Sequence, residues 1–287
     1  MILSMKRFIN ILFLACFALG VTSCQDKIEL DLPDGETFLV VEGWITNEAG
    51  PQTVKLTYTS PYFSDSDQPV AAGATVILKD DEGNEFALEE IESGVYVYND
   101  AGIIGRSYQI LVNLPEGDYY ESDFELLQEP VPIDTIYWRL SEDEPNPDND
   151  ENPDDIYDVL IDTYEPEGRG DHYQWRSFLN GVEARDPFDI FTTDDQLVDG
   201  GPIVEFNVTD ELYSAPDTVV IVQEHISKAA YEFLSLLQAQ TAFVGGPFDT
   251  PPVPIEGNLH NRTNPEKDAL GFFGAAGRDR ATVIVGE

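Results

Sequence analysis

The feature that most restricts the fold is a series of short runs in which apolar and polar residues alternate, each ended by turn-forming residues. The clearest run is QTVKLTYTS (52–60), in which Val54, Leu56 and Tyr58 fall on one face. A period of two residues is typical of a β-strand with one buried face. Comparable runs occupy residues 38–46, 74–80, 85–91, 95–100, 107–114 and 118–126. This spacing predicts an immunoglobulin- or transthyretin-like β-sandwich over residues 36–128.

Residues 129–287 are predicted to form a second β-rich domain with one short helix. Strands are expected at 133–140, 156–164, 172–181 and 217–226. The second and third of these are expected to pair across the turn between them. Ser227 is a suitable N-cap for the helix that follows. Two final strands, at 269–276 and 280–286, are expected to meet at a turn formed by Gly277, Arg278 and Asp279.

Two segments of the second domain are expected to lack regular structure. Residues 141–155 form an acidic loop with eight acidic residues and three prolines. Such a segment cannot bury apolar area, so it should be exposed. Residues 186–206 are rich in Gly and Asp and are also expected to be irregular.

The first 23 residues have the plan of a secretory signal peptide. Lys6 and Arg7 precede a short apolar run at 8–21, whose length suits a signal peptide better than a transmembrane helix. The run ends in Val21-Thr22-Ser23-Cys24, which resembles the bacterial lipobox. Residues 1–23 are therefore predicted to be a lipoprotein signal peptide, with lipid added to Cys24 and residues 24–35 acting as an acylated tether. The alternative is an ordinary secreted protein in which this cysteine has no special role.

Cysteine content and charge restrict the chemistry of the remaining chain. No cysteine follows Cys24, so the mature chain has no thiol for a disulfide, a zinc-thiolate site or a nucleophile. The chain carries 15 basic and 55 acidic residues, a net charge of −40. Nucleic acid is excluded as a partner, because binding phosphates requires a basic surface. The acidity indicates solubility or, alternatively, binding of divalent cations or of a basic partner.

Catalytic signatures are absent from the sequence. His172, His225 and His260 do not have metal-ligand spacing, and the first two fall within expected strands while the third falls in an expected loop. No Gly-x-Ser-x-Gly elbow, Walker loop or dinucleotide-binding fingerprint occurs. The chain is therefore predicted not to be an enzyme and to need no cofactor.

Calcium is the one metal for which the sequence offers candidate ligands. Asp148, Asp150 and Asn152 have the alternate spacing of an oxygen-ligand loop. The pattern departs from an EF-hand, because Pro153 stands where glycine is needed and Val159 where a bidentate glutamate should be. The alternative is a solvated acidic loop. Asp194, Asp195 and Asp199 form a second loose acidic group that is open to the same two interpretations.

Aromatic residues are numerous, and most are expected in the cores. The tryptophans are Trp44, Trp138 and Trp175. Aromatics in loops, such as Tyr62, Phe63 and Phe248, could instead stack on sugars or pack on a partner. This possibility leaves open a stand-alone carbohydrate-binding or adhesin-like surface module.

The order of several segments resembles a known family. VVEGWIT, GATVILKDDEG, VPIDTIYW, ISKAAYEFL, PPVPIEGN and ALGFFGAA follow the predicted lipobox. Together they resemble the Bacteroidota lipoproteins of the domain-of-unknown-function family 4249, over nearly the whole mature chain. Members of that family are typically encoded beside TonB-dependent receptors. The resemblance therefore implies an outer-membrane lipoprotein, exposed at the cell surface or facing the periplasm. It would act as a binding or accessory subunit in nutrient uptake, and no catalytic residues carry over.

Overall fold

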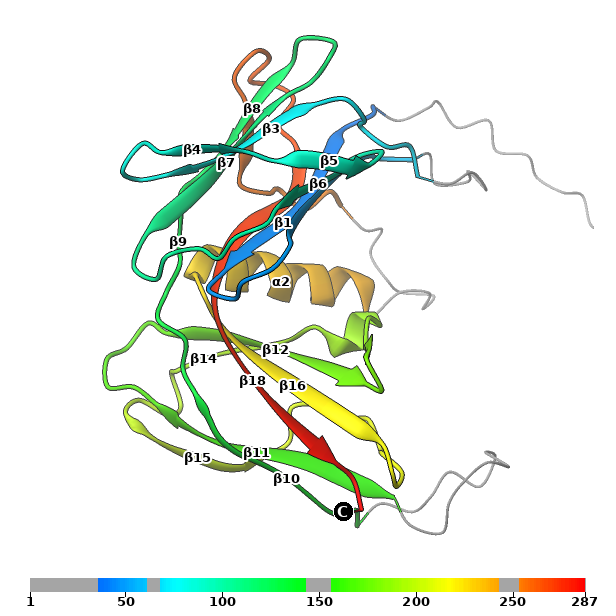
Figure 1. Ribbon diagram of the computed structural model, residues 1–287, viewed down its shortest axis with the longest axis vertical. Coiled ribbons are helices and arrows are strands. Elements are labelled where there is room, and N and C mark those ends of the chain that lie inside the picture. The colour runs from blue at the N-terminus through cyan, green and yellow to red at the C-terminus, as the bar shows by residue number, and fades with distance from the viewer. Residues whose placement is uncertain (1–35, 61–67, 143–155, 243–252, 287) are drawn as a thin grey trace, which may run out of the picture. The chain divides into compact units, whose positions relative to one another are not determined.

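The computed structural model describes residues 36–60, 68–142, 156–242 and 253–286. Contacts divide the chain into two units, Met1–Glu36 and Thr37–Glu287, and all that follows concerns the second. This unit is mainly β, as predicted (Figure 1). Among the described residues, no helix has both the length and the apolar character needed to cross a membrane.

The largest sheet has nine strands and combines residues from both halves of the sequence. Eight of them follow the order β13-β12-β16-β18-β1-β2-β6-β5, and β14 also pairs with β12. In that order the bounds are Val182–Glu183, His172–Leu179, Thr218–Ile226, Leu270–Ile284, Leu39–Thr46, Gln52–Tyr58, Val95–Tyr98 and Glu89–Glu92, with β14 at Phe191–Asp194.

Two smaller sheets pack against opposite ends of the large one. A six-stranded sheet has the order β17-β8-β7-β3-β4, with β9 beside β7; the bounds are Leu259–Asn261, Tyr119–Ser122, Ser107–Asn113, Thr75–Asp80, Glu85–Ala87 and Glu125–Leu126. A three-stranded sheet has the order β10-β11-β15, with bounds Ile133–Leu140, Tyr157–Glu165 and Gly201–Phe206. The helices among the described residues are the short 3-10 helix η1, Pro187–Asp189, and α2, Lys228–Thr241.

The first core is that of a β-sandwich, which confirms the fold class predicted from the sequence. The strands β1 and β2 alternate as predicted, so that Val41 and Leu56 face inward and are fully buried. They pack against Ile110 and Val112 of β7 in the facing sheet. A second core lies between β12, β16 and the three-stranded sheet and includes Trp175.

The strand β18 corrects the expectation of two C-terminal strands. It is continuous: residues 270–276 pair parallel with β1, and residues 277–284 pair antiparallel with β16. The expected turn is absent because its residues have other roles. A side chain at Gly277 would collide with the backbone at Gln128. Arg278 pairs with Glu224 on β16.

Three other expectations about the second half are wrong. The strands β11 and β12 do not pair, because β11 lies between β10 and β15 while β12 lies beside β16. Residues 186–206 contain η1, β14 and β15, and His260 lies in β17 instead of a loop.

Although they follow residue 128, β17 and the first part of β18 pair with strands of the sandwich. Residue 128 is therefore not a boundary between sheets.

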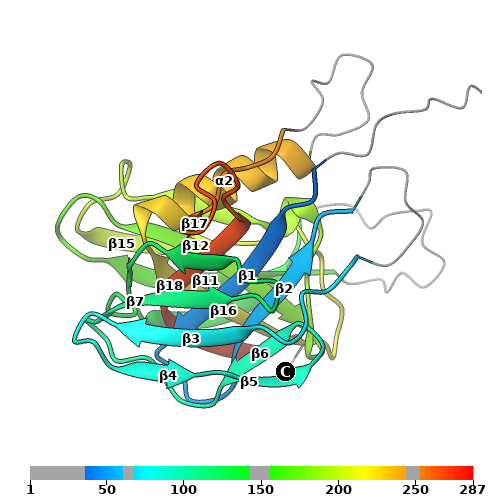
Figure 2. The same cartoon turned by 90° about the horizontal axis from the view of Figure 1, so that it is seen from above.

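Helix α2 begins where the sequence predicts. The backbone N–H of Ala230 donates to the Ser227 hydroxyl at 3.0 Å, which satisfies one of the free donors of the first turn. Ala230 and Leu234 are buried and pack against Ile226 and Phe272. Figures 1 and 2 show α2 alongside β18, on the face of the large sheet opposite the six-stranded sheet.

A buried carboxyl group lies near the start of α2. Glu125 on β9 is only 3% exposed. The side-chain amide of Asn258 donates to one of its oxygens at 3.5 Å, and the other oxygen has no hydrogen-bond partner among the described residues. Burial raises the pKa of Glu125 to about 7, against weaker opposing effects from Ser227 and Asn258. Ionised Glu125 therefore destabilises the fold.

Glu125→Gln should raise the melting temperature at about pH 8 and change it little at about pH 5. The folded pKa lies above the ordinary value of 4.5. Between pH 4.5 and about 7, Glu125 is protonated in the folded wild type but ionised in the unfolded chain. The stability of the wild type therefore rises as the pH falls through this window. Above this window the wild type has the full penalty, roughly 3 kcal/mol. Melting followed by circular dichroism measures both shifts, with Glu92→Gln on exposed β5 as the control. A shift that is equal at the two pH values would contradict the prediction.

Three backbone segments meet closely at Gly271. Its φ is +84°, and a Cβ there would lie 2.1 Å from the carbonyl oxygen of Val41 on β1. A Cβ on Gly257 would in turn lie 1.7 Å from the carbonyl oxygen of Gly271. Only glycine fits at these two positions, because backbone atoms occupy the space that a side chain needs.

Gly271→Ala should therefore lower the free energy of unfolding by at least about 2 kcal/mol, or the melting temperature by roughly 5 °C. Gly201→Ala is the matched control. Its nearest neighbour to a built Cβ is 3.6 Å away, an ordinary contact. Denaturant unfolding of both variants checks the difference, and equal stabilities would be inconsistent with the close approach of the three segments.

Candidate functional site

A groove of about 690 Å³ lies on the outer face of β1, β2 and β18. Strand alternation forms its floor, because Leu39 and Val41 face the core while Val40, Glu42 and Trp44 face outward. Leu270 and Phe272 of β18 complete the floor. The volume is in the range of sites that hold small molecules.

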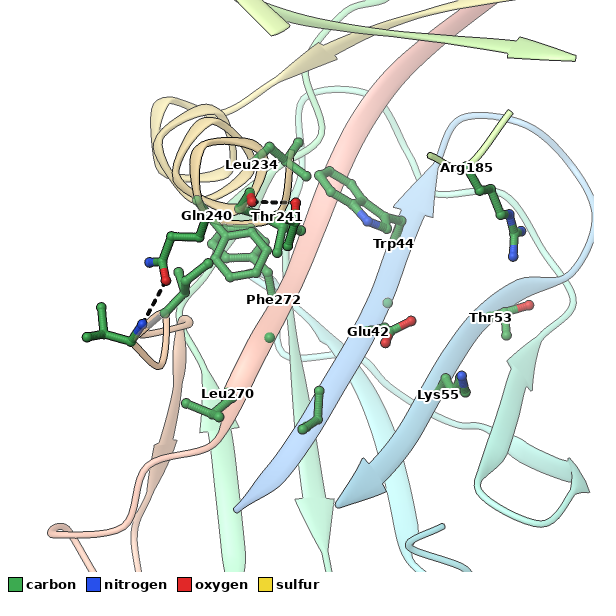
Figure 3. Close-up of a pocket in the computed structure, with 17 residues that line it drawn as sticks. Glu42, Trp44, Thr53, Lys55, Arg185, Leu234, Gln240, Thr241, Leu270 and Phe272 are labelled. Atoms are coloured by element: carbon green, nitrogen blue, oxygen red, sulfur yellow. Dashed lines mark hydrogen bonds between the residues drawn. The ribbon is translucent and has the colours of Figure 1, made fainter. Parts of the chain in front are cut away.

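Helix α2 forms one wall of this groove (Figure 3). Phe233, Leu234 and Leu237 share one helix face, since residues three and four apart lie together. The ring of Phe233 stacks on Phe272 with centroids 5.1 Å apart, and Trp44 lies 6.3 Å from the same ring. The wall of the groove is therefore apolar and partly aromatic.

The opposite rim of the groove is polar. Thr53, Lys55 and Arg185 lie on the side away from α2 (Figure 3). Lys55 is exposed and faces Glu42 across the β1–β2 pair; within the described parts of the chain it forms no ion pair. Arg185 pairs with Glu183. The groove thus combines an apolar wall with two cationic groups and the carboxylate of Glu42, in a chain whose net charge is −40.

Three carboxylates converge elsewhere, at the end of β11. Oxygens of Glu165, Asp171 and Asp195 lie within 4.8 Å of one another; these residues form the acidic cluster. The backbone N–H of Gly200 donates to Glu165 at 2.6 Å, and that of Gly170 donates to Asp195 at 2.6 Å. Burial, followed by repulsion from Asp171, Asp195 and Asp199, raises the pKa of Glu165.

The acidic cluster includes one of the residues that the sequence suggests as calcium ligands. Of the second acidic group, Asp195 belongs to the cluster. Asp194 instead accepts from the Gln196 side chain at 2.6 Å, and Asp199 accepts from the backbone of Gly168 at 3.0 Å. The candidates Asp148, Asp150 and Asn152 lie outside the described residues. Calcium binding therefore stays a prediction without a second supporting feature.

The three histidines have structural contacts. His225 hydrogen-bonds to the Glu129 carbonyl at 2.9 Å and to Asp171 at 3.1 Å. His172 is buried and packs on the ring of Tyr231. A hydrogen bond to Asp268, at 3.0 Å, raises the pKa of His260.

Sequence reasoning missed the groove. Trp44 is expected in the core but lines the groove, whereas Trp175 is in the core as expected. The sequence signal for the groove is the segment FLVVEGWIT, which has apolar residues on both faces of the strand. Such a strand is expected to have other parts of the chain packed on its outer face as well. Tyr62, Phe63 and Phe248 lie outside the described residues.

Comparisons with known proteins identify a family. No curated protein matches the chain. Among solved structures, a segment of two fibronectin type-III domains from chicken tenascin matches with 11% identity and a TM-score of 0.20, covering 67% of this chain and 92% of that one. The family model described as a domain of unknown function, DUF4249, matches residues 25–282. Because this match spans nearly the whole sequence, the chain belongs to the DUF4249 family.

Proposed function

We propose that this protein is a lipid-anchored, non-enzymatic binding subunit of the outer membrane that serves a TonB-dependent receptor in nutrient uptake. The observation that carries the proposal is the groove beside α2. It has the volume of a small-molecule site, an apolar wall and a few polar groups, which is the usual composition of such sites. The lipobox-like sequence that ends at Cys24 supports the anchor, and the order of sequence segments supports the receptor as partner.

The groove favours an amphipathic ligand with an apolar body and an acidic group. The apolar body would pack on Phe272 and Leu237, and the acidic group would face Lys55 and Arg185 on the opposite rim. Charge complementarity supports this choice, because Lys55 is not neutralised by an ion pair within the described residues. A sugar stacked on Trp44 would instead favour the carbohydrate-binding alternative.

Decanoate should bind in the groove and change the fluorescence of Trp44. Decanol and decyltrimethylammonium should bind more weakly, since neither offers an anion to Lys55. Leu237→Gln should weaken binding about tenfold by making the wall polar, whereas Leu236→Gln, on an exposed part of the same helix, should not. Lys55→Gln should weaken decanoate binding by roughly threefold, with Lys228→Gln as the control.

Equal binding of the three probes, or equal effects of the two leucine variants, would reject the groove as an acid-binding site. Binding of a neutral oligosaccharide that depends on Trp44 would favour the carbohydrate-binding module. Trp44→Phe identifies the fluorescence signal, because Trp138 and Trp175 also contribute to the total.

Cys24→Ser should move the protein from the membrane fraction to the soluble fraction. A single-atom change removes the thiol that would carry the lipid, while the strongly acidic body has no affinity for an anionic membrane surface. Fractionation and intact mass measure the change. The same amount of membrane-bound protein in wild type and variant would rule out the anchor.

A TonB-dependent receptor should copurify with the wild type from gently solubilised membranes and should be lost from the Cys24→Ser preparation. Mass spectrometry of the purified complex identifies the partner. Purification of the intact lipoprotein without any such receptor would argue for a module that acts alone.

A further inference from the structure

Three groups that line the groove beside α2 follow one another across the large sheet. Phe272 of β18 is in register with Glu42 of β1, and Glu42 is in register with Lys55 of β2. Because neighbouring strands are about 4.8 Å apart, an aromatic ring, a carboxylate and an ammonium group form a short row (Figure 3). The ring of Phe233 on α2, which stacks on Phe272, continues this row on its apolar side.

The two charges of this row are exposed. The Cβ atoms of directly opposed residues are about 5 Å apart, yet Glu42 and Lys55 form no ion pair with each other or with any other described residue. The second cation of the groove, Arg185, already pairs with Glu183 at 2.7 Å. The groove therefore offers a ligand one carboxylate and one ammonium group that the described part of the chain does not neutralise.

The ring of Trp44 leaves these two charges uncovered. Trp44 follows Glu42 by two residues and points to the same face of the sheet. Its ring lies against Gly274 of β18, where a Cβ would collide with it. The ring is therefore turned toward β18 and away from Lys55, and its centroid is 6.3 Å from that of Phe272. An apolar surface thus lies on one side of Glu42, and a cation lies on the other.

A ligand with a single charge satisfies only one of the two groups. A carboxylate that binds Lys55 is repelled by Glu42, and an ammonium group that binds Glu42 is repelled by Lys55. A head group that carries both charges close together satisfies both side chains at once. An α-amino acid carries its ammonium group and its carboxylate on one carbon, which suits two side chains on directly opposed residues.

We propose that the groove binds an amphipathic α-amino acid, with its ammonium group at Glu42, its carboxylate at Lys55 and its apolar side chain on Phe272 and α2. This inference rests on the proposed function of the groove as a small-molecule site, and it adds an ammonium group to the amphipathic acid. A zwitterion has no net charge, so the net charge of −40 does not oppose its approach.

Isothermal titration of the full-length protein at neutral pH with 2-aminodecanoate, decanoate and decylamine tests the proposal. 2-Aminodecanoate should bind roughly threefold to fivefold more tightly than decanoate, which lacks only the ammonium group. Decylamine lacks the carboxylate and should also bind more weakly than 2-aminodecanoate. These comparisons use the wild type alone, so they do not depend on the folding of any variant.

Glu42→Gln should have opposite effects on the two acids. It should weaken the binding of 2-aminodecanoate roughly threefold, because the partner of the ammonium group loses its charge. It should strengthen the binding of decanoate, because a like charge beside the carboxylate is removed. Lys55→Gln should weaken the binding of both acids. Glu92→Gln removes the same charge as Glu42→Gln on exposed β5 and should bind both acids like the wild type.

Equal binding of 2-aminodecanoate and decanoate by the wild type would overturn the inference and leave the groove as a site for acids. Binding of neither would reject both the inference and the groove as a site for such ligands. Equal weakening of both acids by Glu42→Gln would also overturn the inference, because it would show that this side chain acts on the shape of the groove and not on the ammonium group.

Discussion

The continuous strand β18 is the element on which the rest of the structure depends. Its first half completes the sandwich sheet beside β1, and its second half completes the other half of the sheet beside β16. Successive side chains of β18 point to opposite faces of the sheet. Phe273 therefore faces the sandwich core, while Phe272 faces α2 and the groove. The floor of the groove and the helix that forms its wall are therefore held by the same strand.

Local patterns predicted the parts of the fold that local interactions determine. The period of two residues located the strands of the sandwich, and Ser227 marked the start of α2, because both signals lie within a few residues of the structure they specify. The pairing of β11 and β12 and the turn at Gly277 were wrongly predicted. Both depend on partners far away in sequence: β16 for β12, and the backbone at Gln128 for Gly277.

The candidate sites were less predictable than the fold. With 55 acidic residues, a pair of carboxylates can be found almost anywhere in this sequence. The fold selects among them, bringing Asp195 to Glu165 and Asp171, and Glu211 to Asp186 and Asp189.

The overall charge of the chain opposes the approach of the acidic ligand that the groove favours. A net charge of −40 favours the approach of cations and opposes that of anions over distances up to the Debye length, about 8 Å at physiological salt. The groove has the opposite sign at Lys55 and Arg185, so its affinity for an acid must come from direct contact with these side chains and with the apolar wall. Selectivity in the groove therefore rests on a few neighbouring residues.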